Sequence, residues 1–215
     1  MTESNPVLDL VIRGGTLVDG SGGPAYLGDV GIKDGRIVEV GTVTSAAKRT
    51  LDAKGALVTP GFVDIHTHYD GQATWDGVLA PSSINGVTSI AMGNCGVGFA
   101  PARKDKHDWL IALLEGVEDI PGTALAEGLT WDWETFPDYL DALARRRFAV
   151  DVGAHVPHAA LRAYVMGDRG GDHLEVPTTA EIAEMERLIL EAVQAGALGF
   201  STSRTYVHRS RSGDS

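Results

Sequence analysis

T-P-G-F-V-D-I-H-T-H-Y-D, residues 59–70, is the stretch that decides the predicted fold. The Pro-Gly pair at 60–61 interrupts regular structure, and the run F-V-D-I at 62–65, apolar except for Asp64, is typical of a buried strand. His66 and His68 follow this run directly. Strand side chains alternate, so the two imidazoles share one face, roughly 6.5 Å apart. The stretch therefore predicts a buried strand that ends in a pair of histidines.

The residues before this stretch carry only β-strand patterns. Apolar residues alternate with polar ones at 29–33 and again at 36–40, and Asp34-Gly35 lies between the two runs. An Asp-Gly pair in this position is a strong hairpin signal, because both central residues of a type I′ turn need positive φ. We expect a small β-sheet module over residues 1–59.

After residue 60, strand-like runs alternate with helix-like runs. The clearest helix covers 179–195, with a threonine cap, an acidic first turn, one apolar stripe and Gly196 at its end. Such alternation implies parallel strands joined by right-handed crossovers, as in half of a (β/α)8 barrel or one side of an open sheet. Residues 101–136 look like an insertion over the C-terminal end of the second strand. We place four strands, at 62–66, 88–92, 150–154 and 197–201.

Composition and charge narrow the possible partners and location. The 215 residues include 29 acidic and 18 basic side chains, a net charge of −11 spread along the chain, which argues against nucleic acid or anionic lipid as a partner. The sequence contains neither a secretory leader pattern nor the run of about 18 apolar residues that a membrane span needs. A single cysteine excludes an internal disulfide. We predict a cytoplasmic protein with a small-molecule partner, no nucleic acid and no membrane.

Three residues stand out as candidate metal ligands. His66 and His68 lie at the C-terminal end of the first predicted strand, and Cys95 follows the second strand in M-G-N-C-G-V-G, residues 92–98. Either feature alone is weak, because a His-x-His pair is common and a lone cysteine is more often a small buried hydrophobe. Parallel strands, however, bring these ends together, where barrels place catalytic groups. Asp70 is a further candidate ligand, although we favour a turn-capping role.

Longer motifs make a family resemblance specific. Residues 59–70 resemble the first-strand signature of the amidohydrolase superfamily, preceded by its small β module. Residues 86–101, G-V-T-S-I-A-M-G-N-C-G-V-G-F-A-P, and 196–202, G-A-L-G-F-S-T, are similar to the D-aminoacylase branch, the N-acyl-D-amino-acid deacylases. The resemblance covers essentially the whole chain. The Gly-Asn-Cys-Gly segment is its most discriminating part.

The resemblance implies a zinc enzyme. His66 and His68 would belong to one metal position, and Cys95 to the tighter or bridging one, which gives one tight zinc site and room for a second, weaker site. Many relatives bridge two metals with a carboxylated lysine on the fourth strand. The predicted fourth strand at 197–201 has no lysine, so a cysteine bridge is the available substitute.

The resemblance also points to groups outside the metal cluster. Tyr206 falls where the family presents a tyrosine to the substrate, although the family more often has a glycine near position 203. His158 matches a histidine that recurs before Ala-Leu-Arg, and for His155 a site-lining role and a structural hydrogen bond weigh equally. The general-base aspartate is expected beyond Ser215. The remaining histidines, His107, His173 and His208, have no supporting context, and we expect them to be solvated.

These observations predict an α/β protein. A small β-sandwich module over 1–59 would be followed, over 60–215, by the first half of a (β/α)8 TIM-type barrel, truncated after about the fourth barrel strand. The activity that the resemblance implies is hydrolysis of the amide bond of N-acyl-D-amino acids or related N-acyl amines by a zinc-activated water. A cyclic-amide hydrolase, such as a hydantoinase or dihydroorotase, and a non-catalytic barrel paralogue are the alternatives. A half-barrel alone would be inactive, bind zinc weakly, and self-associate or unfold readily.

Overall fold

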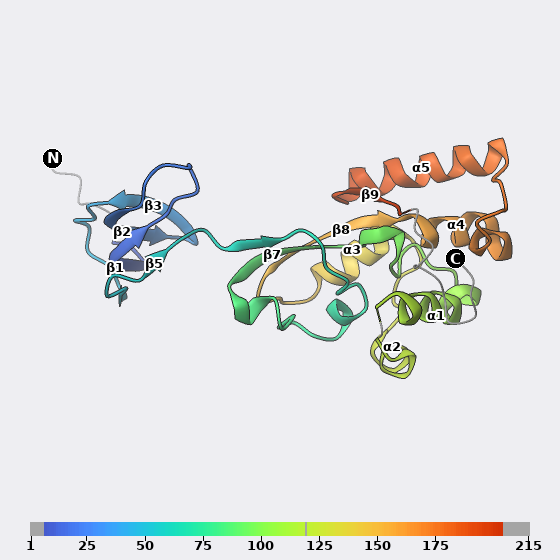
Figure 1. Cartoon of the computed structure of the whole chain (residues 1–215), viewed down its shortest axis with the longest axis horizontal. Coiled ribbons are helices and arrows are strands. Elements are labelled where there is room, and N and C mark those ends of the chain that lie inside the picture. Colours follow the sequence, from blue (N-terminus) through green and yellow to red (C-terminus); the bar gives the residue numbers. More distant parts are fainter. Residues whose placement is uncertain (1–6, 119, 204–215) are drawn as a thin grey trace. The chain divides into compact units, whose positions relative to one another are not determined.

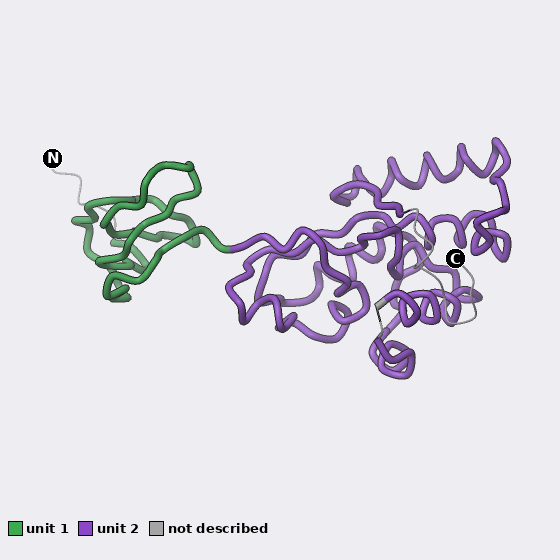
Figure 2. Tube along the Cα trace, in the orientation of Figure 1, with its two compact units in different colours: residues 1–61 green, residues 62–215 purple. Residues whose placement is uncertain are grey.

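A computed structural model describes residues 7–118 and 120–203 of the chain. The chain divides into two compact units, Met1–Gly61 and Phe62–Ser215 (Figures 1 and 2). Each unit has a sheet of its own. No helix in the described part combines the length and the apolar character that crossing a bilayer requires.

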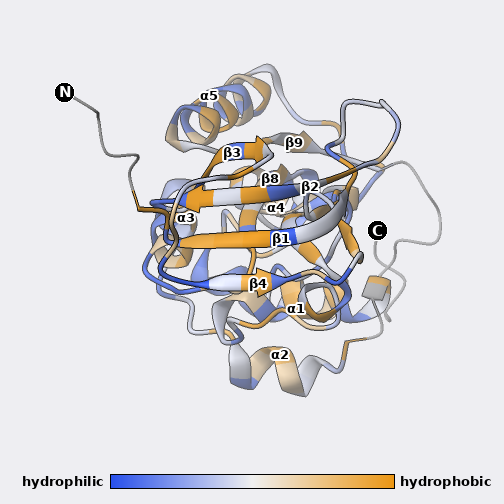
Figure 3. Ribbon diagram, turned by 90° about the vertical axis from the view of Figure 1, so that its left-hand side faces the viewer, coloured by the Kyte–Doolittle hydropathy of each residue, from blue (hydrophilic) through white to orange (hydrophobic). Residues whose placement is uncertain are grey.

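The first unit is built on one mixed sheet. Its central strand β1 is antiparallel to β2, which pairs with β3, while β4 and β5 run parallel to β1 along its other edge. Figure 3 colours the first half of β1 as hydrophobic, and Val11 there packs with Leu8 and Val43 in a small core. All five described strands join this one sheet, so a two-sheet sandwich stays a prediction. The strands are β1 Leu10–Leu17, β2 Tyr26–Lys33, β3 Arg36–Gly41, β4 Thr50–Asp52 and β5 Leu57–Val58.

The predicted hairpin of this unit is confirmed. Asp34 and Gly35 connect β2 to β3, and their φ angles are 49° and 71°. Both values lie in the left-handed region that a type I′ turn requires.

The second unit contains four parallel strands in sequential order, β6-β7-β8-β9. All four predicted strands are present, with shifted bounds. The first is shorter than predicted because it leaves the ladder after Asp64. It is also not the buried strand we expected: Phe62 and Val63 are exposed, because β6 is an edge strand of the described sheet. The third continues to Pro157. Sequential parallel order is the order of consecutive strands in half of a (β/α)8 barrel. The strands are β6 Phe62–Asp64, β7 Val87–Met92, β8 Asp151–Pro157 and β9 Gly199–Ser201.

Helices cover one face of this sheet. Side chains of β7 and β8 that point to that face, such as Met92 and Val156, are buried with residues of α3, α4 and α5. The predicted helix 179–195 is confirmed at both ends, where Thr178 forms a capping box with Glu181 and Gly196 has a φ of 119°. The helices are α1 His107–Glu118, α2 Gly122–Gly128, α3 Phe136–Ala144, α4 His158–Met166 and α5 Thr179–Ala195, and the short 3-10 helices are η1 Gln72–Thr74, η2 Ser83–Asn85, η3 Asn94–Gly96, η4 Lys104–Lys106 and η5 Gly167–Gly171.

The segment 101–136 carries α1 and α2 and is tied to the chain that follows β7. The Trp133 indole donates a 2.7 Å hydrogen bond to the carbonyl oxygen of Phe99. Trp131 stacks on His107, with ring centroids 3.6 Å apart and planes 6° from parallel. The prediction that His107 is solvated was therefore wrong: its ring is half-buried, and burial lowers its pKa. His173, by contrast, is exposed.

Candidate metal centre

Cys95 lies in a tight turn that begins where β7 ends. The turn consists of η3 and Gly93, which precedes it. The φ angles of Gly93, Cys95 and Gly96 are 74°, 56° and 80°, so these three residues have the left-handed conformation. This conformation is natural for glycine, but in a non-glycine residue it costs about 1–3 kcal/mol and persists only when its surroundings enforce it. Cys95 is therefore held in place by specific contacts.

The first set of contacts joins this turn to the histidine pair. The Asn94 amide nitrogen donates to the carbonyl oxygens of Thr67, at 3.1 Å, and Ala91, at 2.9 Å. Thr67, which stands between the two histidines, donates to the same Ala91 oxygen from its backbone nitrogen, at 3.0 Å, and from its hydroxyl, at 2.8 Å. Thr67 and Asn94 are both buried. These bonds lock the end of β6 onto the end of β7.

The second set comes from the end of β9. The Ser201 hydroxyl accepts a 3.0 Å hydrogen bond from the Gly96 backbone nitrogen and donates to the Gly93 carbonyl oxygen. One side chain thus bridges the two ends of the Cys95 turn. The position of the thiol depends on residues from three strand ends.

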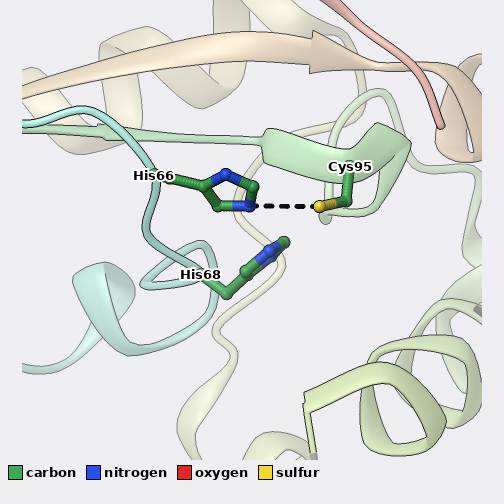
Figure 4. Close-up of side chains that lie close together, drawn as sticks. All are labelled: His66, His68 and Cys95. Carbon is green, nitrogen blue, oxygen red and sulfur yellow. Dashed lines mark hydrogen bonds between the residues drawn. The ribbon is translucent and has the colours of Figure 1, made fainter.

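The structure brings the three predicted ligands together. The His66 Nε2 and Cys95 Sγ atoms are 3.1 Å apart, and the two imidazole centroids are separated by 5.5 Å. Ligand atoms of all three side chains lie within 4.8 Å of one another, and Figure 4 shows them converging from the ends of β6 and β7. His66 is exposed, while His68 and Cys95 are half-buried. One ion could reach all three from solvent.

The donor set and spacing suit zinc. Thiolate sulfur and imidazole nitrogen are its common protein ligands, and usual bond lengths in a tetrahedral site set the ligand atoms roughly 3.3–3.6 Å apart. The observed separations, from 3.1 Å to at most 4.8 Å, bracket that range. Three protein ligands that leave a fourth position for water are typical of catalytic zinc, whereas structural zinc is usually held by four.

Asp70 lies outside this three-residue cluster. The residue is 2% exposed, and its backbone oxygen accepts a 2.8 Å hydrogen bond from the Tyr139 hydroxyl. Burial, together with the Asp70 charge, raises the pKa of Tyr139 well above its usual value, so this hydroxyl stays a donor. The contact ties the loop after the histidines to α3.

The predicted substrate-binding residues differ in what the structure describes. His158 opens α4, and its Nδ1 lies 2.9 Å from the Thr202 hydroxyl while its ring meets Phe200 edge-to-face. It therefore lies at the carboxyl end of the sheet, as the cluster does, and its contact with substrate stays a prediction. Tyr206 lies outside the described residues.

Sequence reasoning assigned no role to Asn94, Thr67 or Ser201. All three hold the cluster through bonds to backbone atoms. All three stood inside quoted motifs. The available signal, a place directly beside a candidate ligand, applied only to Thr67 and Asn94.

Comparisons with known proteins show which family the chain resembles. The profile of the Amidohydrolase family matches residues 49–213. A D-aminoacylase of Alcaligenes xylosoxydans xylosoxydans is 38% identical over 206 residues, which cover 95% of this chain and 39% of that protein. The chain thus spans about two fifths of the length of this curated relative.

Solved structures similar to this chain include relatives of the same kind. A D-aminoacylase studied for its binuclear metal center superposes with a TM-score of 0.74 at 36% identity, over 91% of this chain and 38% of that one. The N-acyl-D-glutamate deacylase of Bordetella bronchiseptica, complexed with zinc and a phosphonate mimic of the tetrahedral intermediate, gives 0.72 at 33% identity, over 92% and 38%.

The hydantoinase alternative has less support. A D-hydantoinase of Ralstonia pickettii is 43% identical, but over only 63 residues, or 29% of this chain. The profile match, by contrast, extends from the first unit to the end of the described residues and beyond. This chain belongs to the amidohydrolase family.

Proposed function

We propose that the protein hydrolyses the amide bond of N-acyl-D-amino acids with zinc held by His66, His68 and Cys95. The observation that carries the proposal is the convergence of two imidazoles and one thiol within 4.8 Å at the ends of adjacent parallel strands. Relatives that share this part of the chain are named for D-aminoacylase and N-acyl-D-amino-acid deacylase activity, and one was solved with zinc.

The chain's own residues would supply a fixed ligand set. When bound, zinc would polarise the acyl carbonyl and lower the pKa of a coordinated water toward about 7. His66 and His68 would hold it from the loop after β6, and Cys95 from the turn after β7. Asn94 and Thr67 would fix this loop and this turn relative to each other. We do not assign the role of general base to any described side chain.

We further propose that the Cys95 thiolate belongs to the tighter metal position. Thiolate is the strongest zinc ligand in the cluster and can be shared between two ions, and one relative has a binuclear metal center. With the thiolate as a bridge between the two positions, the histidine pair and Cys95 would together form the second, weaker site. His158 and Tyr206 are the residues we assign to the substrate.

The test measures amide hydrolysis by the protein expressed from its complete reading frame, after chelation and again after zinc is restored. N-acetyl-D-amino acids with acidic and with apolar side chains are compared with their L-enantiomers and with a hydantoin. We expect zinc-dependent turnover of D substrates and little of L substrates. Faster ring opening of the hydantoin would favour a cyclic-amide hydrolase, and zinc binding without any turnover would favour a non-catalytic paralogue.

A further inference from the structure

We propose that His155 is a substrate-contacting residue, one that donates a hydrogen bond to an oxygen of the bound N-acyl amino acid. The proposal rests on the proposed function. Its starting point is the position of His155 in β8, two residues before the strand ends at Pro157.

The imidazole points to the face of the sheet that the helices leave open. Val152, Ala154 and Val156 of β8 pack on the helix-covered face, so His155, which alternates with them, points the other way. Strand register places Gly199 of β9 beside it, and Ala91 of β7 beside Gly153. His155 is the one residue with an ionisable side chain among the described residues that β7 and β8 place on the carboxyl half of this face.

Glycines lie on both sides of His155, Gly93 against its backbone and Gly199 near its ring. A Cβ on Gly93 would stand 2.2 Å from the His155 carbonyl oxygen, so the chain that leads to Cys95 passes directly against the His155 backbone. On the other side, a Cβ on Gly199 would come within 3.6 Å of the His155 Nδ1 atom. Toward the start of β8, Leu198 fills the space over Gly153. His155 thus lies toward the carboxyl end of the open face, among small residues and next to the segment that leads to Cys95.

The buried Nδ1 atom of His155 has no hydrogen-bond partner among the described residues. A buried polar group without a partner costs free energy, and its persistence in a folded protein calls for an explanation. At the ends of parallel strands, beside a metal cluster, a ligand oxygen supplies one. An N-acyl amino acid offers two such oxygens, on the acyl carbonyl and on the carboxylate.

The test compares three variants of the zinc-loaded enzyme. His155→Leu removes the donor, His155→Asn keeps an amide nitrogen near the position of Nδ1, and His107→Leu is the matched control. His107 is also half-buried and also has a buried ring nitrogen without a partner among the described residues, but it lies in α1. For each variant we would measure KM, kcat, the inhibition constant of a phosphonate analogue, zinc content and thermal unfolding.

We expect His155→Leu to raise KM and the inhibition constant about tenfold, the loss of roughly one hydrogen bond to an oxygen of the ligand. Zinc content should not change, and the melting temperature should not fall, because leucine removes an unpartnered polar group. His155→Asn should recover part of the affinity, and His107→Leu should bind as the wild type does. Substrates with the carboxylate converted to an amide identify the oxygen: if the effect vanishes with them, it is the carboxylate, and if it persists, the acyl carbonyl.

An unchanged KM and inhibition constant in His155→Leu would overturn the inference, and so would a loss of zinc, which would make the residue part of the metal site. If the wild type itself hydrolysed no acyl amino acid, the proposed function would fail first. That result is visible before any variant is compared.

Discussion

The two faces of the β6-β7-β8-β9 sheet are built in different ways. On the helix-covered face, Met92 and Val156 are among the most buried side chains of the unit and pack on apolar residues of α3, α4 and α5. At the carboxyl end of the open face, small residues surround His155, and the loops beyond carry the metal cluster. Apolar burial stabilises the first region, whereas hydrogen bonds between distant residues fix the second. Changes in the two regions should therefore affect different properties.

The largest expected effect is on zinc binding. Cys95→Ala should weaken zinc affinity by about 10²–10³-fold, since a four-ligand zinc site is worth roughly 10–16 kcal/mol and one ligand accounts for about a quarter of it. The melting temperature without zinc should hardly change. Titration calorimetry measures the affinity. Removing the exposed histidine in His173→Ala is the control, and wild-type zinc affinity in Cys95→Ala would exclude the thiol as a ligand.

The opposite pattern is expected on the helix-covered face. Leu161 of α4 is 1% exposed in the core, so Leu161→Ala should lower the free energy of unfolding by about 2–5 kcal/mol through lost burial and a cavity. Zinc affinity of the folded protein should stay within about twofold, because no contact of the cluster is removed. Urea unfolding and calorimetry together check this. A parallel loss of zinc affinity would show that the two regions are coupled.

Asn94 should affect both zinc affinity and stability, because its amide holds the cluster in place and satisfies buried carbonyl oxygens. Asn94→Ala should cost about 1–3 kcal/mol of stability and weaken zinc binding about tenfold. Asn85→Ala is the matched control, since that amide also donates to a backbone oxygen, of Pro81, but is exposed. Equal zinc affinities for the two variants would mean that Asn94 does not orient the ligands.

The smallest effect concerns pH. Burial lowers the pKa of His107, the Asp108 charge opposes this shift to a smaller extent, and the Lys104 charge adds to it. The unfolded chain then binds this proton more readily, so the free energy of unfolding should fall as pH drops from about 6.5 toward the folded pKa. His107→Phe keeps a ring on Trp131 and should flatten that part of the curve. Unfolding measured across this pH range would show the same slope in both proteins if His107 were not the cause.

Local signals explain what sequence analysis could predict. Thr178, Glu181 and Gly196 mark both ends of α5, and Asp34-Gly35 marks the hairpin, because each feature depends on residues close together in the chain. The cluster was predictable for a related reason. Each ligand follows a recognisable strand, and parallel strands bring their ends together.

The supporting contacts of the site were not predictable in this way. Asn94 and Thr67 are 27 residues apart, and the hydroxyl of Ser201 reaches Gly93 across 108 residues. No periodic pattern records such pairs. His107 was misjudged for the same reason, since the residue that stacks on it, Trp131, lies in a separate part of the insertion. The metal ion, the substrate, the role of Tyr206 and the cytoplasmic location stay predictions.

X-ray absorption at the zinc edge tests the metal assignment most directly. We expect protein loaded with one zinc per chain to show a sulfur ligand at about 2.3 Å and nitrogen or oxygen ligands at about 2.0–2.1 Å. The sulfur signal should disappear in Cys95→Ala, which removes the one cysteine of the chain. A wild-type spectrum that contains only nitrogen and oxygen ligands would contradict a zinc centre formed by His66, His68 and Cys95.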